Sequence, residues 1–392
     1  MDFHFTEDQQ ALREAVGRLC ADFDLGYWAR LDREGGFPHE FHGACAAGGW
    51  LGIARPAEVG GAGLGITEAA LLMHTISRSG AGFSGASAVH MNIFGLQPVI
   101  RFGTLEQQKR FLPPLIDGRE KACFAVTEPD AGLNTLGMKT FARRDGDVYR
   151  VNGQKLWIST AQVADRMLLL ARTRSAQELA EAGLPATRGL SLFYTRFDRE
   201  RIEVREIDKM GRKAVDSNQL FIDDLVIPLE DRIGEEGRGF EYILHGLNPE
   251  RILIAAEAVG LGQAALERAA AYAGERVVFG QPIGRNQGIQ HPLAQRWVEL
   301  EAAELLVWRA AWAYDRGEPA GPHANAAKYA GGEAGFKACE TAVLTHGGMG
   351  YAREYHVERF MREAMIPRIA PVSPQLILSF LAEKVLGLPK SY

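Results

Sequence analysis

Apolar residues in the first part of the chain recur every three or four positions, as they do on the buried face of an amphipathic helix. This spacing predicts a first helix over residues 7–23. Thr6, followed three positions later by Gln9, predicts a capping box at the start of that helix. Further helices are expected near residues 67–79, 88–101 and 104–116.

The pattern changes near residue 120, where short β-rich runs alternate with turn residues. Asp145-Gly146 and Asn152-Gly153 are typical of two-residue hairpin turns. Strands at this spacing predict a β-sandwich or a small barrel. The expected strands are residues 123–127, 139–144, 148–152, 155–159, 166–172, 190–194, 202–207 and 219–222.

A helical period returns after residue 239 and continues to the end of the chain. Long segments at 287–316 and 323–346 favour a helix bundle. The predicted fold is therefore a multidomain α+β protein. It has an N-terminal all-α domain (1–120), a central β-barrel or sandwich domain (121–235) and a C-terminal four-helix bundle (236–392).

The segment Gly260-Leu-Gly-Gln-Ala-Ala265 fits the pattern of a dinucleotide-binding turn. It lies inside a helical period and no strand precedes it, so its structural context excludes that role. The small residues instead predict close packing between helices.

Composition narrows the class of protein. The 392 residues carry a net charge of −5, which argues against a nucleic-acid partner bound through bulk charge. The 4 cysteines form no CxxC pair, and neither they nor the histidines are spaced as metal ligands, so no metal is expected. No apolar run is long enough for a membrane span, and the N-terminus lacks a targeting pattern; these features favour a cytoplasmic protein.

Several segments combine a turn with groups that could hold a ligand. A strand enters a turn at Phe124–Gly132, and Trp157 and Ser159 share one face of a later strand. Arg276 follows a helix and could pair with a phosphate, and glycines 347 and 348 permit close backbone approach. Each feature taken alone also has a purely structural explanation.

Glu250 has two interpretations at this stage. Asn248 looks like a helix N-cap, Pro249 like the first helical residue and Glu250 like an acidic residue that complements the helix dipole. Alternatively, Glu250 is a carboxylate base directed into the bundle. Residue spacing does not decide between them.

Taken together and in order, these segments resemble the acyl-CoA dehydrogenase family over residues 3–388. The resemblance implies FAD, an acyl-CoA substrate, an electron-transferring flavoprotein as acceptor, and a homotetramer in which residues 276–287 reach the FAD of a neighbouring subunit. The residues implied to contact FAD are Phe124, Val126, Thr127, Trp157, Ser159, Arg276, Phe279, Gln287, Gly347, Gly348, Ser373 and Gln375. Substrate contacts are implied for Leu133, Asn248 and Arg251.

Three positions depart from the family pattern. Pro371 occupies the place where many members carry the catalytic glutamate, and it cannot act as a base. A minority of members carry the base on the long bundle helix just before an arginine, and Glu250-Arg251 falls at that position. Leu133 stands where a serine commonly contacts the acyl-CoA, and Leu344 where a glutamine often contacts FAD.

The resemblance therefore implies α,β-dehydrogenation of an acyl-CoA to the 2-enoyl-CoA, with Glu250 as general base and hydride transfer to flavin N5. Two alternatives stay open from the sequence. One is a flavin-dependent oxidase or monooxygenase of the same fold, and the other is a non-catalytic FAD- or acyl-CoA-binding protein. The sequence does not define the length or branching of the acyl chain.

Overall fold

The computed structural model describes residues 4–391. Its N-terminal part is helical, and the first helix begins with the predicted capping box, in which the Thr6 hydroxyl accepts from the N–H of Gln9. The segments Ser77–Ala81 and Met91–Gly95 are single π-helical turns on either side of α5. The helices are α1 (Glu7–Ala21), α2 (Leu25–Glu34), α3 (His39–Ala47), α4 (Ile66–Ile76), α5 (Gly82–His90), α6 (Gln97–Phe102) and α7 (Leu105–Ile116).

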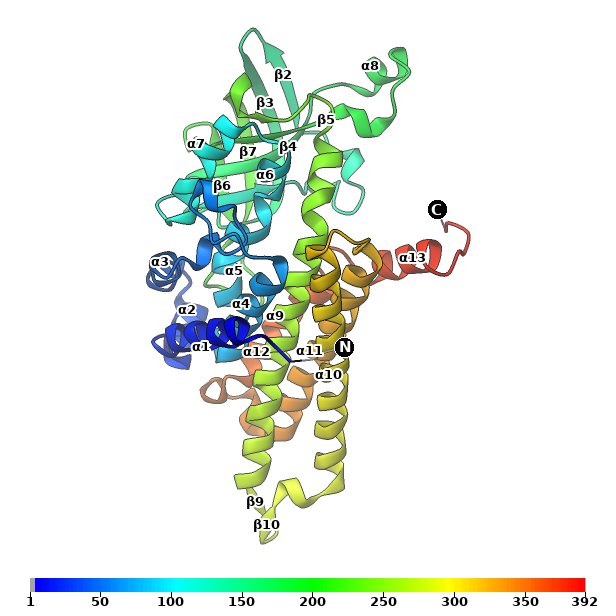
Figure 1. Ribbon diagram of the computed structural model, residues 1–392. Coiled ribbons are helices and arrows are strands. Elements are labelled where there is room, and N and C mark those ends of the chain that lie inside the picture. Colours follow the sequence, from blue (N-terminus) through cyan, green and yellow to red (C-terminus); the bar gives the residue numbers. More distant parts are fainter. Residues whose placement is uncertain (1–3, 392) are drawn as a thin grey trace.

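The central part is one eight-stranded sheet, shown at the top of Figure 1. Its order is β6-β7-β3-β2-β4-β5-β8, with β1 pairing in parallel with β4. The path of the described strands is open and does not close into a barrel. The strands are β1 (Ala122–Ala125), β2 (Phe141–Asp145), β3 (Val148–Ser159), β4 (Arg166–Arg172), β5 (Leu190–Arg196), β6 (Ile202–Glu206), β7 (Ser217–Pro228) and β8 (Arg232–Ile233).

One of the two predicted hairpin turns is correct. Asp145 pairs with Val148 across a two-residue turn that joins β2 and β3. The turn expected at Asn152-Gly153 is wrong, because this dipeptide lies inside β3, where the register with β7 shifts between Val151 and Gly153. A β-bulge and a hairpin turn share the same small-residue signal, so the sequence could not separate them.

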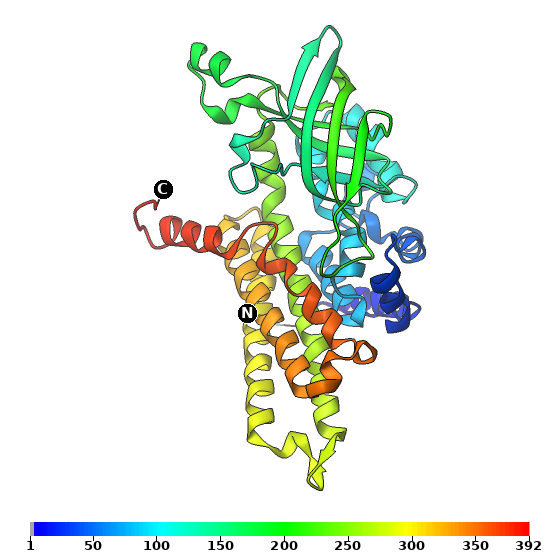
Figure 2. The ribbon, with the colours of Figure 1, turned by 180° about the vertical axis from the view of Figure 1, so that it is seen from behind.

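The C-terminal part is built on three long helices: α9 (Gly239–Glu275), α10 (Gln287–Asp315) and α11 (Gly321–His346). A short hairpin of β9 (Val277–Val278) and β10 (Gln281–Pro282) joins α9 to α10. Figures 1 and 2 show α9 running from the sheet at one end of the molecule to this hairpin at the other. The chain ends with α12 (Val357–Glu363), which packs on the long helices, and α13 (Pro374–Lys384), which projects sideways.

Close packing of small residues holds α9 against its neighbours, as the sequence predicted. A Cβ atom on Gly260 would lie 2.5 Å from the carbonyl oxygen of His74 in α4. A Cβ atom on Gly335 of α11 would lie 2.4 Å from the carbonyl oxygen of Ala258. Real side chains do not fit at such distances, so these glycines fix how closely α4, α9 and α11 approach one another.

Candidate active site

Glu250 lies on α9 at the point where the helix becomes fully buried. Glu250 is only 8% exposed, and its Oε2 has no hydrogen-bond partner among the described residues. The predicted helix start at Asn248 is wrong, because α9 begins at Gly239 and continues through Pro249. Packing of α9 against the sheet and α6 sustains the turns before the proline, although Pro249 itself supplies no N–H to them. The dipole explanation of Glu250 therefore fails.

Burial raises the pKa of Glu250 to about 7. The positive charges of His90, Arg251 and Lys328 lower this pKa, and the negative charge of Glu257 raises it. Arg251 is held by the side-chain oxygen of Asn248, which accepts from Nη1 at 3.0 Å. A carboxyl group with such a pKa exists in both protonation states near neutral pH, which suits a general base.

Lys328 connects Glu250 to the loop in which the family's more common base position lies. The Lys328 side chain is buried on α11, and its ammonium donates to the carbonyl of Val372 at 2.5 Å. Val372 directly follows Pro371. Since the charge of Lys328 also acts on Glu250, the loop with Pro371 and the α9 carboxylate are next to the same cation.

Trp157 is not a core residue, because 55% of its surface is exposed. It lies in β3 where the register with β7 shifts between Lys155 and Ile158, and its backbone is left-handed with φ of 61°. A non-glycine residue in this conformation costs energy, and such residues cluster at functional sites. The adjacent Leu156 donates its N–H to the Thr127 carbonyl at 2.8 Å, so the predicted Phe124–Gly132 turn lies beside the tryptophan.

A buried lysine fastens that turn to β3. Lys155 donates to the carbonyl of Val126 at 3.0 Å and forms an ion pair with Glu128 at 2.9 Å. Burial lowers the pKa of Lys155 to about 8, while Glu128 opposes this effect. Sequence reasoning missed this pair, although both residues belong to segments that it had selected.

Arg212 connects the tryptophan strand to the N-terminal helices. Its guanidinium donates to the hydroxyls of Ser159 (2.9 Å), Ser217 (3.1 Å) and Ser87 of α5 (3.2 Å). Burial lowers the pKa of Arg212, and Nε has no hydrogen-bond partner among the described residues. Nothing in the sequence singled out Arg212 beyond its place in a glycine-containing loop.

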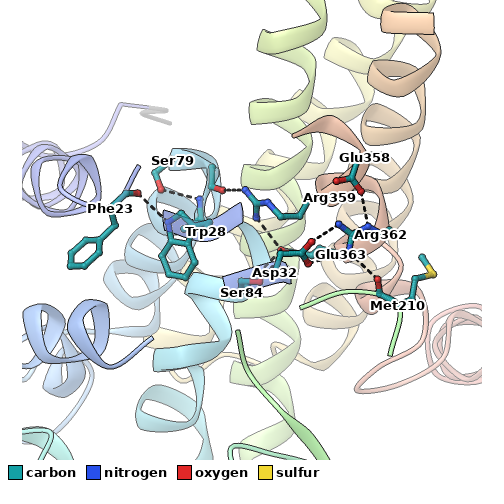
Figure 3. A network of polar contacts seen from close by, with 12 residues as sticks. Phe23, Trp28, Asp32, Ser79, Ser84, Met210, Glu358, Arg359, Arg362 and Glu363 are labelled. Atoms are coloured by element: carbon teal, nitrogen blue, oxygen red, sulfur yellow. Dashed lines mark hydrogen bonds and ion pairs between the residues drawn. The ribbon is translucent and has the colours of Figure 1, made fainter. Parts of the chain in front are cut away.

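Charged side chains of α12 fix the loop of Arg212 and α5 in place (Figure 3). Arg362 donates to the Met210 carbonyl at 3.0 Å and pairs with Asp32 of α2 at 2.6 Å. Glu363 accepts from the Ser84 hydroxyl at 2.7 Å. These contacts fasten α2 and α5 of the N-terminal domain and the Arg212 loop to the C-terminal bundle.

Three consecutive segments of the chain match the three domains of one protein family. Residues 6–119 match the acyl-CoA dehydrogenase N-terminal domain, 123–225 the middle domain and 237–385 the C-terminal domain. The chain belongs to the acyl-CoA dehydrogenase family.

Several known proteins are similar to this chain over nearly its whole length. Acyl-CoA dehydrogenase FadE12 of Mycobacterium tuberculosis is 38% identical and covers 99% of this chain and 98% of its own. The CarC subunit of the caffeyl-CoA reductase–Etf complex of Acetobacterium woodii is 34% identical, with coverages of 93% and 94%. A glutaryl-CoA dehydrogenase solved with glutaryl-CoA has a TM-score of 0.93 at 32% identity, covering 100% and 98% of the chains. The FAD complex of PigA has a TM-score of 0.92 at 26% identity, covering 99% and 100%.

The residues that the family resemblance associates with FAD lie in three separate places in this acyl-CoA dehydrogenase fold. Phe124, Val126, Thr127, Trp157 and Ser159 come together at one side of the sheet. The hairpin residues Arg276 and Phe279 lie at the far end of α9, about 39 Å along the helix axis from Glu250, and Phe279 is fully exposed. One chain therefore does not bring the two sets together.

The remaining predicted residues lie toward opposite ends of α11. Gly347 and Gly348 follow its last residue, His346, which stacks on Tyr272 near the hairpin end of α9. Ser373 and Gln375 lie at the start of α13, next to Val372, which Lys328 contacts near the start of α11. Gly347 ends α11 with φ of 61°, and a Cβ atom on Gly347 or Gly348 would meet open space. Ser373 caps α13 by accepting from the N–H of Leu376. The side chains of Gln287, Gln375, Leu133 and Leu344 are also exposed.

The described residues fit a flavin dinucleotide. Trp157 offers a flat exposed surface, and Arg212, which contacts Ser159, has a buried Nε donor without a hydrogen-bond partner among the described residues. Near the hairpin end of α9, Gly347 and Gly348 leave space for a close ligand. Nowhere in residues 4–391 do three or more His, Cys, Asp or Glu side chains gather in a way that could hold a metal ion. None of the helices in that range combines the length and the apolar character needed to cross a membrane.

Proposed function

We propose that this protein catalyses the FAD-dependent α,β-dehydrogenation of an acyl-CoA thioester with Glu250 as the general base. The observation that carries the proposal is the buried Glu250 carboxylate, which has one unpaired oxygen and a pKa of about 7. A base with this pKa can take the proton of a thioester α-carbon near neutral pH. No other carboxylate takes the family's common position, because Pro371 stands there.

FAD supplies the hydride-accepting chemistry when it is bound. Trp157 and Ser159, with the turn at Val126 and Thr127, would hold its ring system, and Arg212 would donate beside them. Ser373 and Gln375 would hold a further part of this FAD, whereas Gly347 and Gly348, which lie near the hairpin of Arg276, would contact the FAD of a neighbouring subunit. These assignments rest on the position of each residue and on the resemblance of its segment to the family.

The chain's own residues then prepare Glu250 for proton transfer. Arg251, positioned by Asn248, and Lys328 favour the ionised carboxylate, while burial keeps water away and raises its basicity. Leu133 is exposed next to the flavin turn and would contact the substrate through its apolar side chain. The hydrogen bonds of Arg212 would keep the strand that carries Trp157 in a fixed position relative to α9.

The assembly that we propose is a homotetramer in which each hairpin completes a neighbour's site. Phe279 is fully exposed on the hairpin that also holds Arg276. Helix α10 exposes a stripe of large apolar side chains, which supports its burial against another subunit. The stripe consists of Trp297, Val298, Leu305 and Trp312. The electron acceptor would be an electron-transferring flavoprotein, since the CarC relative belongs to a reductase–Etf complex.

An anaerobic titration of the purified flavoprotein with saturated acyl-CoA thioesters tests this function. We expect one thioester class to bleach the flavin absorbance of the wild type and to leave that of Glu250→Gln unchanged. Bleaching in both proteins would remove Glu250 as the base. A flavin that no thioester bleaches would contradict dehydrogenation, and rapid reoxidation of reduced enzyme by air would favour an oxidase.

A further inference from the structure

A second buried carboxylate lies on the same face of α9 as Glu250. Glu257 follows by seven residues, which places it two turns and about 10 Å further along the helix. It is 0% exposed, and its Oε1 lies 2.6 Å from Nδ1 of His90, the last residue of α5. Its Oε2 has no hydrogen-bond partner among the described residues.

An unpaired oxygen on a buried carboxylate is costly and calls for an explanation. The charge of Glu257 is already compensated. Burial lowers the pKa of His90, but the Glu257 carboxylate outweighs burial, and the pKa of the imidazole is raised. The Arg212 guanidinium also acts on Glu257. The group that Oε2 lacks is therefore a neutral hydrogen-bond donor and not a further cation.

The exposure of α9 indicates which part of a substrate reaches Glu257. Before Glu250, the helix is partly open to solvent, with Leu244 and His245 exposed. From Ile252 to Gly262, every residue is buried. The CoA moiety is large, charged and polar, so it must leave toward the exposed turns. With the α-carbon at Glu250, the acyl group then points along the buried turns toward Glu257.

We propose that the His90–Glu257 pair determines acyl specificity by accepting a hydrogen bond from a hydroxyl group on the acyl chain. This inference rests on the proposed function, because it places the thioester α-carbon at Glu250. It assigns the substrate class as hydroxy-substituted acyl-CoA thioesters in which the hydroxyl lies well beyond the β-carbon. An acyl chain without that hydroxyl leaves Glu257 Oε2 unpaired, and the enzyme discriminates against it.

Binding to the Glu250→Gln enzyme separates specificity from turnover. Straight-chain acyl-CoA thioesters of increasing length, ending in a methyl, hydroxyl or amino group, are titrated by calorimetry. At one length, we expect the hydroxyl-ended thioester to bind roughly 10- to 100-fold more tightly than the methyl-ended one, because a hydrogen bond to a charged acceptor is worth that much. A ratio near one at every length, or a preference for the amino group, overturns the inference.

Two further variants link the preference to the pair. Glu257→Gln keeps the shape of the side chain and should remove most of the preference. His90→Leu combined with Glu257→Met replaces the ion pair with apolar groups of similar size, which buried sites often tolerate. This double variant should favour the methyl-ended thioester. Glu267→Gln is the matched control, because Glu267 is exposed on the same helix, and it should leave the ratio unchanged.

The two proposals fail in different ways. If no thioester bleaches the wild-type flavin, the dehydrogenase function fails, while the binding ratio still decides the role of the pair. If bleaching occurs but the double variant keeps the wild-type ratio and melts at the wild-type temperature, the function stands and the specificity role is excluded.

Discussion

At the scale of single residues, the raised pKa of Glu250 predicts how the stability of the protein depends on pH. Its folded-state pKa of about 7 lies above the ordinary value of 4.5, so the unfolded chain releases this proton more readily. The contribution of the protonated carboxyl to stability is therefore complete below pH 4.5 and is lost as the pH rises through about 7. Glu250→Gln, which stays neutral, should be more stable than the wild type at pH 8 by roughly 3 kcal/mol.

The measurement is urea unfolding of both proteins, followed by circular dichroism at pH 5 and pH 8. The stability difference should be small at pH 5 and should grow toward pH 8. Glu267→Gln on the exposed side of α9 serves as the control and should show no such growth. An equal difference in unfolding free energy at both pH values would mean that burial does not raise the pKa of Glu250.

At the scale of elements, the glycines of α9 set the helix spacing. Gly260→Ala places a methyl group 2.5 Å from the His74 carbonyl, and backbone atoms must move to accept it. We expect a loss of about 1–3 kcal/mol, as overpacked cores show, measured as a lower unfolding free energy. Gly274→Ala on the same helix meets nothing within 4 Å and should be neutral or stabilising by roughly 0.5 kcal/mol. Equal effects of the two substitutions would refute the packing role.

The elements also show how far the sequence could be interpreted. Periodicity was sufficient for helices such as α1, whose buried residues Leu12, Val16 and Cys20 recur every four positions. Strand β4 was predicted because it is a continuous apolar run with an arginine at each end. The interpretation failed at Asn248 because N-cap residues are also tolerated inside a helix that packing sustains from both sides. It failed at Gly153 because the signal for a bulge equals the signal for a turn.

The sequence predicted only part of the candidate site. The physical reason differs from the one that applies to the helices and strands. Family resemblance selected Glu250 and Trp157, because each belongs to a short continuous sequence motif. Arg212 and the His90–Glu257 pair act through contacts between residues far apart in sequence, with 167 positions separating His90 from Glu257. A single sequence holds no record of such pairs, so only the fold brings them into view.

At the scale of the whole molecule, the proposed site needs two chains, because Glu250 and Arg276 lie about 39 Å apart along one helix. Co-expressing Glu250→Gln with Arg276→Glu tests this directly. Each homo-oligomer should be inactive, the first for want of a base and the second because reversed charge repels the FAD phosphates. A mixed pair, however, contains one site with a native Glu250 from one chain and a native Arg276 from the other. Random pairing should restore roughly a quarter of wild-type acyl-CoA dehydrogenation, with FAD retained in about half of the sites, because half of all hairpins carry the native Arg276. If the mixture stays inactive although both chains co-purify, each site is complete within one chain and the hairpin has another role.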